Sequence, residues 1–407
     1  MARDRDFEVV LWGATGFTGA LVARHLADTY GDQLRWAIAG RNREKLEQLR
    51  RDIDLPGLSI LRADSSDRAS LDAMAARSAV ICTTVGPYAS LGENLLAACV
   101  AAGTDYCDLT GEVQWMAKMI DRYDAAAHAS GARIVHTCGF DSIPSDLGTW
   151  FLQQAMQRQY GEYADVVKSR VGRFSGAASG GTIASMMRMF EEASGDPAVR
   201  EAMANPYSLN PAGERSGPDG PDRNKPVYDQ EFRQWSSTFI MAAVNSRVVR
   251  RSNALAGYPW GRDFRFDERQ LTGDGGRGRR RAAAICAGTG LTTIAMAVAP
   301  VRTLAARFLP SPGEGPSPEA QRRGHFELLF HGLSSASGNA LMARVSGDRD
   351  PGYGATSRML GEAAVCLARD KPVCAGGFWT PAIALGERLI ARLEADAGMT
   401  FQLLAGE

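Results

Sequence analysis

The amino-terminal part of the chain alternates short, nearly unbroken apolar runs with longer amphipathic stretches. An uninterrupted apolar run is typical of a strand buried on both faces of a parallel sheet, and an amphipathic stretch is typical of a helix covering that sheet. The predicted strands lie at 7–12, 35–40, 59–62, 79–85, 104–107 and 132–137, with helices that include 20–26, 70–77, 91–102 and 113–130. This order predicts a doubly wound α/β domain, a six-stranded Rossmann fold, over residues 1–150.

The first predicted strand ends in a glycine-rich turn, Gly13-Ala14-Thr15-Gly16-Phe17-Thr18-Gly19, and a helical pattern follows at once. Gly13 permits a sharp exit from the strand, Gly16 a close approach to phosphate, and Gly19 tight packing of helix on strand. The N–H groups of the first helical turn and the helix dipole then favour a pyrophosphate. A purely structural turn is the alternative, but the order strand, glycines, helix favours a dinucleotide site.

The end of the second strand indicates which dinucleotide the domain prefers. An NAD-binding enzyme usually has Asp or Glu there to hold the ribose hydroxyls, whereas this chain has Gly40-Arg41, and a guanidinium suits a 2′-phosphate. The sequence therefore predicts NADP(H) as cofactor, with Arg41 opening a solvated helix as the alternative. After the third strand, the Asp64 carboxylate is a candidate acceptor for the adenine amino group, with Ser65 beside it.

Two further strand ends bring candidate catalytic residues to the carboxyl edge of the sheet, where open α/β folds bind ligands. The fourth strand leads into Val85-Gly86-Pro87-Tyr88, in which Tyr88 is either a hydrogen-bond donor to substrate or a ring packed on the cofactor. Tyr88 lacks the lysine partner of short-chain reductases, because Gly92 lies four residues later. The sixth strand leads to Asp141, a candidate for orienting the nicotinamide, and to Ser142 and Asp146, which suit helix capping or function equally.

Beyond residue 160 the strict alternation stops, which predicts an α+β domain over residues 151–350 for substrate binding or dimerisation. A helix at 183–193, a strand at 239–243 and a long proline-rich loop at 205–226 are expected there. Residues 351–407 are expected to form carboxyl-terminal helices, at 355–369 and 381–396, that pack back on the first domain. A turn at 376–381 leads into the second of these helices.

Residues 282–301 carry no charge and follow four arginines at 277 and 279–281. Twenty residues could span a membrane, but this stretch is largely Ala, Gly and Thr with few large apolar side chains. Three interpretations stay open, namely a buried helix beside the substrate pocket, a helix on a membrane surface, and a true span. A stiff connector at 309–318 follows.

Composition narrows the function classes. The chain has 46 basic and 46 acidic residues, so no global positive charge points to nucleic acid. Its seven cysteines form no C-x-x-C pair and no Cys/His cluster of zinc spacing, which argues against a metal site and for a reducing compartment. We expect a cytoplasmic protein, with a peripheral contact at the inner membrane and a homodimer as open alternatives.

Several motifs together resemble those of the saccharopine dehydrogenase-like oxidoreductases, and most closely the trans-acting enoyl reductases. They are Gly13–Gly19, Ala39-Gly40-Arg41, Val85–Tyr88, Gly139–Asp146, Pro312–Pro316, Gly352–Thr356 and Gly377-Phe378-Trp379-Thr380-Pro381. The resemblance covers essentially the whole chain. It implies a Rossmann NADP-binding domain with a second α+β domain, and NADPH-dependent reduction of a carbon–carbon double bond in a polyketide or lipid acyl chain, free or carrier-bound.

Two other functions stay open at this point. A saccharopine dehydrogenase-type oxidoreductase acts on a dicarboxylic amino acid and needs cationic groups facing it, but no arginine is assignable to that role from the sequence. A non-catalytic protein that binds NADP(H) and associates with lipid is the third possibility, since no acid/base constellation stands out.

Overall fold

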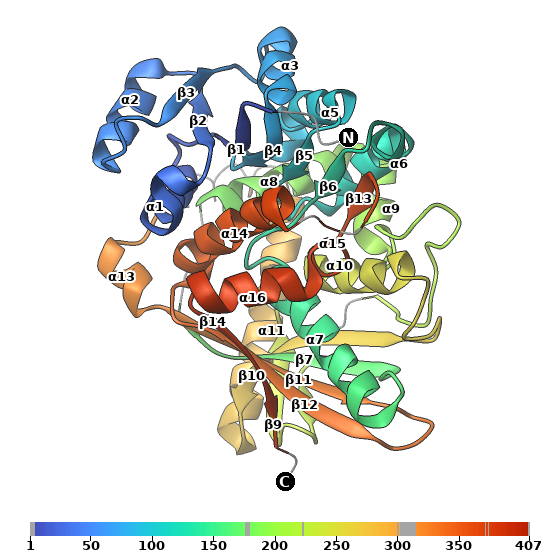
Figure 1. Ribbon diagram of the computed structural model, residues 1–407. Helices are drawn as coiled ribbons and strands as arrows, with labels where there is room; N and C mark the ends of the chain where they lie inside the picture. Colours follow the sequence, from blue (N-terminus) through green and yellow to red (C-terminus); the bar gives the residue numbers. More distant parts are fainter. Residues whose placement is uncertain are drawn as a thin grey trace.

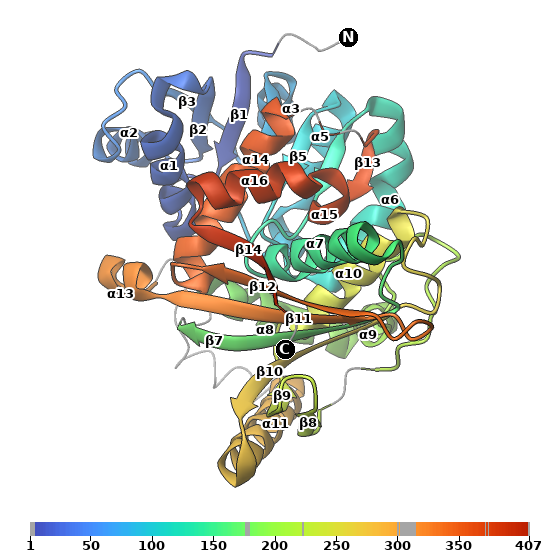
Figure 2. The same ribbon diagram turned by 60° about the horizontal axis from the view of Figure 1, so that its bottom comes forward.

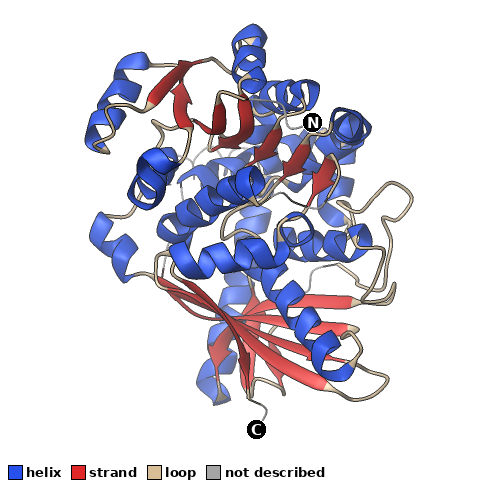
Figure 3. Ribbon diagram, in the orientation of Figure 1, coloured by secondary structure: helices blue, strands red, loops and turns tan. Residues whose placement is uncertain are grey.

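Within residues 5–405, apart from 176–179, 222–223, 299–300, 302–314, 371 and 373, the computed structural model contains two seven-stranded sheets (Figure 1, Figure 3). The strands of the first sheet are β1 (Phe7–Trp12), β2 (Trp36–Gly40), β3 (Ser59–Arg62), β4 (Ser78–Thr83), β5 (Asp105–Cys107), β6 (Arg133–Val135) and β13 (Gly377–Trp379). They are all parallel and lie in the order β3-β2-β1-β4-β5-β6-β13. This is the doubly wound topology that the sequence predicts, and the six predicted strands end within two residues of the observed ones.

Helices cover both faces of the first sheet. The elements between its strands are α1 (Phe17–Tyr30), η1 (Gly31–Gln33), α2 (Arg43–Asp52), α3 (Arg68–Ala76), α4 (Tyr88–Leu91), α5 (Glu93–Ala102) and α6 (Val113–Ser130). Successive residues of β1 serve opposite faces, since Val9 packs with α1 and α2 whereas Val10 packs with α3, α5 and α6. The cofactor edge is therefore held rigidly between two apolar layers.

The seventh strand corrects the sequence prediction. Residues 376–381 are predicted to be a turn, whereas β13 pairs with β6, with Phe378 opposite Ile134. A strand of three residues is too short to display the alternation by which strands are recognised.

The second sheet is mixed and lies beneath the first in the view of Figure 1. Its strands are β7 (Val166–Ser175), β8 (Val227–Asp229), β9 (Gln234–Thr238), β10 (Arg265–Gly273), β11 (His325–Leu333), β12 (Ala340–Gly347) and β14 (Met399–Leu404), in the order β14-β12-β11-β7-β10-β9-β8. Only β7 and β10 are parallel neighbours among these described strands. The helices of this half are α7 (Ile143–Tyr160), α8 (Gly180–Gly195), α9 (Pro197–Ala204), α10 (Ala242–Leu255), α11 (Gly275–Ala297) and α13 (Pro318–Arg323).

The predicted strand at 239–243 is wrong. The strand β9 ends at Thr238, and α10 begins at Ala242. The residues between them, Phe239, Ile240 and Met241, line a cavity. Their side chains form a short apolar run, which in the sequence resembles a strand.

The loop at 205–226 contains no helix or strand among its described residues, as predicted, and α10 fastens it. Arg247 donates to the carbonyl of Asn205 and Arg251 to that of Leu209. Arg250 donates to the carbonyl of Pro206 and to the Asp219 carboxylate. These buried guanidinium groups replace the missing secondary structure as hydrogen-bond partners for the loop backbone.

The carboxyl-terminal part contributes to both sheets. It comprises the π-helical turn η2 (Pro351–Ala355), α14 (Thr356–Arg369), β13, α15 (Pro381–Ala384), α16 (Gly386–Asp396) and β14. Helix α14 packs on the first sheet beside α1, where Glu362 accepts from Tyr30 and lies 2.8 Å from His25. Because β13 joins the first sheet and β14 the second, this segment ties the two halves together.

The uncharged stretch at 282–301 lies mostly within α11, which begins earlier than predicted and includes the four arginines. In the described part of the chain, no helix is both long and apolar enough to cross a membrane. Much of the connector at 309–318 lies outside the described residues.

Candidate active site

The glycine turn after β1 is built for close approach. Gly13 has φ +84°, and a Cβ there would lie 2.6 Å from Val85 Cγ2. A Cβ on Gly19 would collide with the carbonyl of Gly13, so helix and strand can pack this tightly only with glycine there. Gly16 is the N-cap of α1 and offers no side chain to its first turn. The open first-turn N–H groups fit a pyrophosphate.

The other residues of the predicted turn divide between core and cleft. Ala14 is fully buried and Thr15 is exposed. Gly16, Phe17, Thr18 and Gly19 line a large cavity that opens at the carboxyl edge of the first sheet. The Phe17 ring packs edge-on against Tyr353 of η2, with the ring centroids 4.7 Å apart.

The adenosine end of the predicted cofactor site lies after β2 and β3. Arg41 is exposed directly after Gly40, whereas the neighbouring Arg43 is engaged by Glu47 at 2.8 Å. The Asp64 carboxylate accepts hydrogen bonds from the N–H and the hydroxyl of Ser66, and these bonds lower the pKa of Asp64, with a further contribution from the positive charge of Arg41. Arg41 and Asp64 are thus near each other, as a ribose-phosphate and adenine site requires.

The loop after β4 is fixed by a carboxylate that the sequence does not single out. Glu112 is fully buried and accepts from the N–H groups of Tyr88 and Ala89 at 2.9 and 2.8 Å. It also accepts from the hydroxyl of Ser185 on α8 at 2.7 Å. Burial raises the pKa of Glu112 although these bonds oppose the rise. The only indication of this role in the sequence is the position of Glu112 shortly after β5, at the carboxyl edge of the sheet.

The hydroxyl of Tyr88 contacts the backbone, and its ring faces the cavity. The hydroxyl donates to the carbonyl of Thr83 and accepts from the N–H of Leu109, each at 3.2 Å. The ring lies 5.5 Å from that of Trp115, and Gly86, Pro87 and Tyr88 line the cavity. Burial raises the pKa of Tyr88 well above 10. Val85 contacts the glycine turn instead of the cavity.

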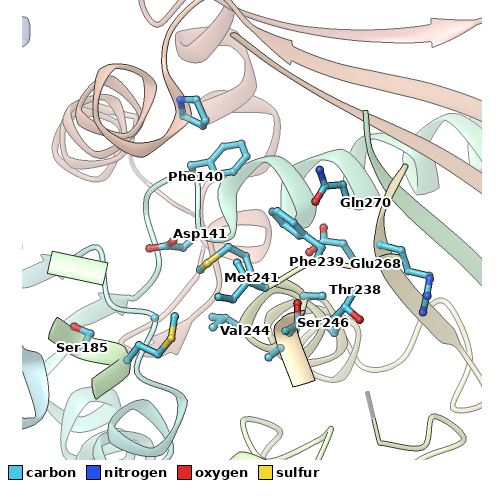
Figure 4. Close-up of a pocket in the computed structure, with 18 of the residues that line it drawn as sticks. Phe140, Asp141, Ser185, Thr238, Phe239, Met241, Val244, Ser246, Glu268 and Gln270 are labelled. Atoms are coloured by element: carbon cyan, nitrogen blue, oxygen red, sulfur yellow. The ribbon is translucent and has the colours of Figure 1, made fainter. Parts of the chain in front are cut away.

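Asp141 points into the cavity (Figure 4). Within the described residues its carboxylate forms no hydrogen bond or ion pair. Burial, and secondarily the negative charge of Asp108, raises the pKa of Asp141 to about 7. Asp108 itself is held by the N–H groups of Thr110 and Thr137 and lies 2.7 Å from Nδ1 of His136. Asp141 is therefore a carboxyl group able to hold a proton near neutral pH.

Ser142 and Asp146 have structural partners, and neither caps its own helix. Ser142 donates to the side-chain oxygen of Asn245 on α10 at 3.1 Å, and α7 has no side-chain cap. Asp146 accepts from the Ser252 hydroxyl and from the N–H of Ala382 at 2.8 Å. Burial raises the pKa of Asp146 to about 7 as well, but its side chain does not line the cavity.

The cavity has a volume of about 1340 Å³ and runs from the first turn of α1 to the second sheet. Its wall is largely apolar, and apolar side chains come from α8, α9, α10, α11 and the link between β9 and α10. Figure 4 shows Phe239 and Met241 of this link beside Val244 of α10. They include Met186, Met189, Phe190, Met203, Phe239, Ile240, Met241 and Ile285. The sequence does not identify this wall, because its residues are far apart along the chain.

The cations that line the cavity already have partners. Lys168 pairs with Glu231 at 2.6 Å, and Arg170 pairs with Asp229 and Asp267 at 2.8 and 2.7 Å. The other lining cations are Arg250, which pairs with Asp219, Arg265, which donates to the Pro218 carbonyl, and Arg269, which donates to Ser236. A dicarboxylic ligand would have to displace a carboxylate from Lys168, Arg170 or Arg250 to be bound by it.

The sequence profile of the saccharopine dehydrogenase NADP-binding domain matches residues 9–135. Over an alignment of 427 positions the chain is 42% identical to a Mycobacterium tuberculosis protein provisionally named a trans-acting enoyl reductase, covering 98% of both chains. It is 38% identical over 408 residues to the trans-acting enoyl reductase of Mycobacterium bovis, covering 96% of both.

Among solved structures, the fold is similar to that of apo saccharopine dehydrogenase (L-Glu forming) from Saccharomyces cerevisiae. The TM-score is 0.55 at 12% sequence identity, with 98% of this chain and 99% of that chain covered. At this identity the likeness concerns the fold alone.

Proposed function

The chain belongs to the saccharopine dehydrogenase-like oxidoreductases and is an NADP-dependent member of them, and on that premise we propose that it is an enoyl reductase acting on a polyketide or lipid acyl chain. The substrate, as a free molecule or on a carrier, is placed with its reacting double bond beside Asp141 and its apolar chain in the cavity. Cytoplasmic location and a homodimer through the second domain stay predictions.

One observation carries this proposal. The phosphate turn and an apolar chamber are parts of one continuous cavity, and Asp141 lines it together with Tyr88 and Pro87. An apolar wall suits an acyl chain, whereas the engaged cations offer little to a dicarboxylate.

The residues divide the chemistry as follows. When bound, NADPH supplies a hydride, which adds to the β-carbon of the enoyl group. Asp141 holds the proton that the α-carbon requires, so its O–H bond breaks as the new C–H bond forms, and solvent reprotonates the carboxylate. The glycine turn, Arg41 and Asp64 bind the dinucleotide. The ring of Tyr88 orients the reacting groups, and its hydroxyl bonds to Thr83 and Leu109 support positioning over proton donation.

A substrate panel tests the proposal against its two rivals. NADPH absorbance is followed with a long-chain enoyl thioester, a lipid enone, and a mixture of L-glutamate and an amino-acid semialdehyde. We expect NADPH consumption with an enoyl or enone substrate and a product heavier by two hydrogens. Consumption only with the glutamate mixture, by reduction of the imine that it forms, would favour the amino-acid oxidoreductase. NADPH binding with no consumption would favour the non-catalytic binding protein.

A further inference from the structure

Helix α11 is attached to the body of the protein by one narrow face. Its buried positions are Gly278, Ala282, Cys286 and Met296, and it packs on β9, β10 and α8. Figure 2 shows α11 at the bottom of the view, beyond the second sheet. Positions 285, 289, 290 and 295 are half-buried, and the other described positions of the helix are exposed.

One exposed stripe runs along the helix. Positions 277, 280, 284, 287, 291 and 294 are all exposed, and their alternating spacing of three and four places them on one face. Val298, the C-cap residue directly after the helix, is exposed as well. Arg277 and Arg280 occupy the amino-terminal end. Leu291 is 69% exposed, Ile294 66% and Val298 46% at the other end. Large aliphatic side chains this exposed and this close together are unusual for a surface.

The two ends differ in charge as well as in polarity. In the described part of the chain, Arg277, Arg280 and Arg281 form no ion pair. The acidic residue nearest along the chain, Asp274, accepts from the N–H of Gly275 and so caps the helix. Arg279 instead stacks over the ring of Trp235 at 5.5 Å. From residue 280 to residue 294 the helix rises about 21 Å. A cationic end and an aliphatic end on one stripe match the headgroup and acyl regions of an anionic bilayer.

The opposite side of the same helix lines the cavity, through Ile285, Thr289, Thr292 and Thr293. Ile240, which is 55% exposed, also lines it. A single helix therefore separates the proposed acyl chamber from the aliphatic stripe. An apolar substrate held in a bilayer would lie next to the chamber if this stripe faced the lipid.

We propose that the exposed stripe of α11 docks the protein on an anionic lipid bilayer, with Leu291, Ile294 and Val298 in the acyl boundary and the arginines at the headgroups. The docking itself is independent of the catalytic proposal, and only the delivery of an acyl substrate rests on the proposed function. The charge pattern favours lipid over a second copy of this chain, because a self-association through the same stripe would bring like charges together or leave the arginines unpaired.

Vesicle sedimentation tests the docking. The full chain is mixed with phosphatidylcholine vesicles, with or without about one third phosphatidylglycerol, and the bound fraction is measured at low and high salt. Leu291→Glu/Ile294→Glu should weaken binding by about 100-fold, about tenfold for each side chain kept out of the bilayer. Arg277→Ala/Arg280→Ala should remove the preference for phosphatidylglycerol and the salt dependence. Leu403→Glu, on the exposed end of β14, is the matched control and should bind like the unaltered chain.

Three results would overturn the proposal. They are failure to bind anionic vesicles, equal binding by the Leu291→Glu/Ile294→Glu variant, and a change of oligomeric state in that variant without vesicles, which would assign the stripe to a protein contact. NADPH consumption with a short, soluble enoyl thioester separates the two proposals. The α11 variants should retain this NADPH consumption. If the unaltered chain shows none, the catalytic proposal is refuted and the docking result is unaffected.

Discussion

Replacing Asp141 with Asn tests whether this carboxyl group supplies a proton. The cavity raises the pKa of Asp141 from 3.8 to about 7, so about half of the protein carries the proton at pH 7, against less than about 0.1% for an unshifted aspartate. Such a shift corresponds to about 4 kcal/mol against the ionised form. An amide fills the same space but cannot donate a carboxyl proton.

The expected loss follows from what a positioned acid contributes. Asp141→Asn should lower kcat by about 100- to 10,000-fold, with the Kd for NADPH changed by less than about twofold. The protonated carboxyl is the active form, so kcat of the unaltered chain should be constant below pH 7 and fall about tenfold per pH unit above it. The residual activity of Asp141→Asn should lose this dependence. Stopped-flow NADPH oxidation under single turnover measures the chemical step.

Asp146, on the helix α7 that begins just after Asp141, provides a matched control. The pKa of Asp146 is also raised to about 7 by burial, but its carboxylate bonds to Ser252 and Ala382 and not to the cavity. Asp146→Asn should therefore leave the pH midpoint of kcat in place, even where it lowers stability. An unchanged kcat in Asp141→Asn, or a midpoint that moves only in Asp146→Asn, would refute the assignment.

The same shift predicts a stability difference that needs no substrate. A folded-state pKa above the unfolded value adds stability that is fully present below about pH 4 and is lost as the pH rises through about 7. Relative to Asp141→Asn, the unaltered chain should thus lose up to about 4 kcal/mol of unfolding free energy between pH 4 and pH 8. Urea denaturation of both proteins at the two pH values measures it. Parallel curves would show that Asp141 is not buried enough to hold its proton.

Three further variants test other parts of the site. Arg41→Ala should weaken NADPH binding by about 10- to 100-fold and leave NADH binding unchanged, because a charge-assisted bond to phosphate is lost. Arg43→Ala is the control, because the Arg43 guanidinium is engaged by Glu47. Fluorescence titration measures the affinity of both variants. Tyr88→Phe should lower kcat by about two- to fivefold with no change in NADPH affinity, since only the hydrogen bonds to Thr83 and Leu109 are lost. A fall in kcat of about 100-fold or more would instead indicate that the Tyr88 hydroxyl is the general acid. Glu112→Gln should lower the unfolding free energy by about 1–3 kcal/mol, because the amide cannot accept from all three donors. Ser185→Ala removes a single donor and should lower the unfolding free energy by less, as measured by the same urea denaturation.

The cofactor half of the molecule could be predicted from the sequence because its signals are local. The turn from Gly13 to Gly19 lies on one short strand–helix junction. The strand ends that precede Arg41 and Asp64 can be located because each strand is an apolar run and the runs follow one another along the chain. NADP(H) as cofactor is confirmed by the family match. Which contacts the individual residues make with it stays a prediction, now with a geometry that suits them.

The substrate half could not be predicted because its contacts are not local. The cavity wall combines side chains from α8, α9, α10 and α11, and the sequence distances between them carry no periodic signal. Phe239, Ile240 and Met241 even mimic a strand, since cavity-lining residues and strand residues are apolar for the same reason. Glu112 escaped notice because nothing in its neighbourhood along the chain shows that three donors converge on it.

The arrangement of the carboxyl-terminal segment explains how the two halves produce one site. Helix α7 carries Asp146, and that buried carboxylate accepts from Ser252 on α10 and from Ala382 at the start of α15. Because α15 follows β13 of the first sheet and α10 lines the cavity, this single group fixes the cavity wall relative to the cofactor edge. Hydride transfer depends steeply on distance and orientation, so the two sheets have to be held in register for the reaction to proceed. If the two sheets formed independent domains without this link, the protein would still have both binding sites, but nothing would hold them in register.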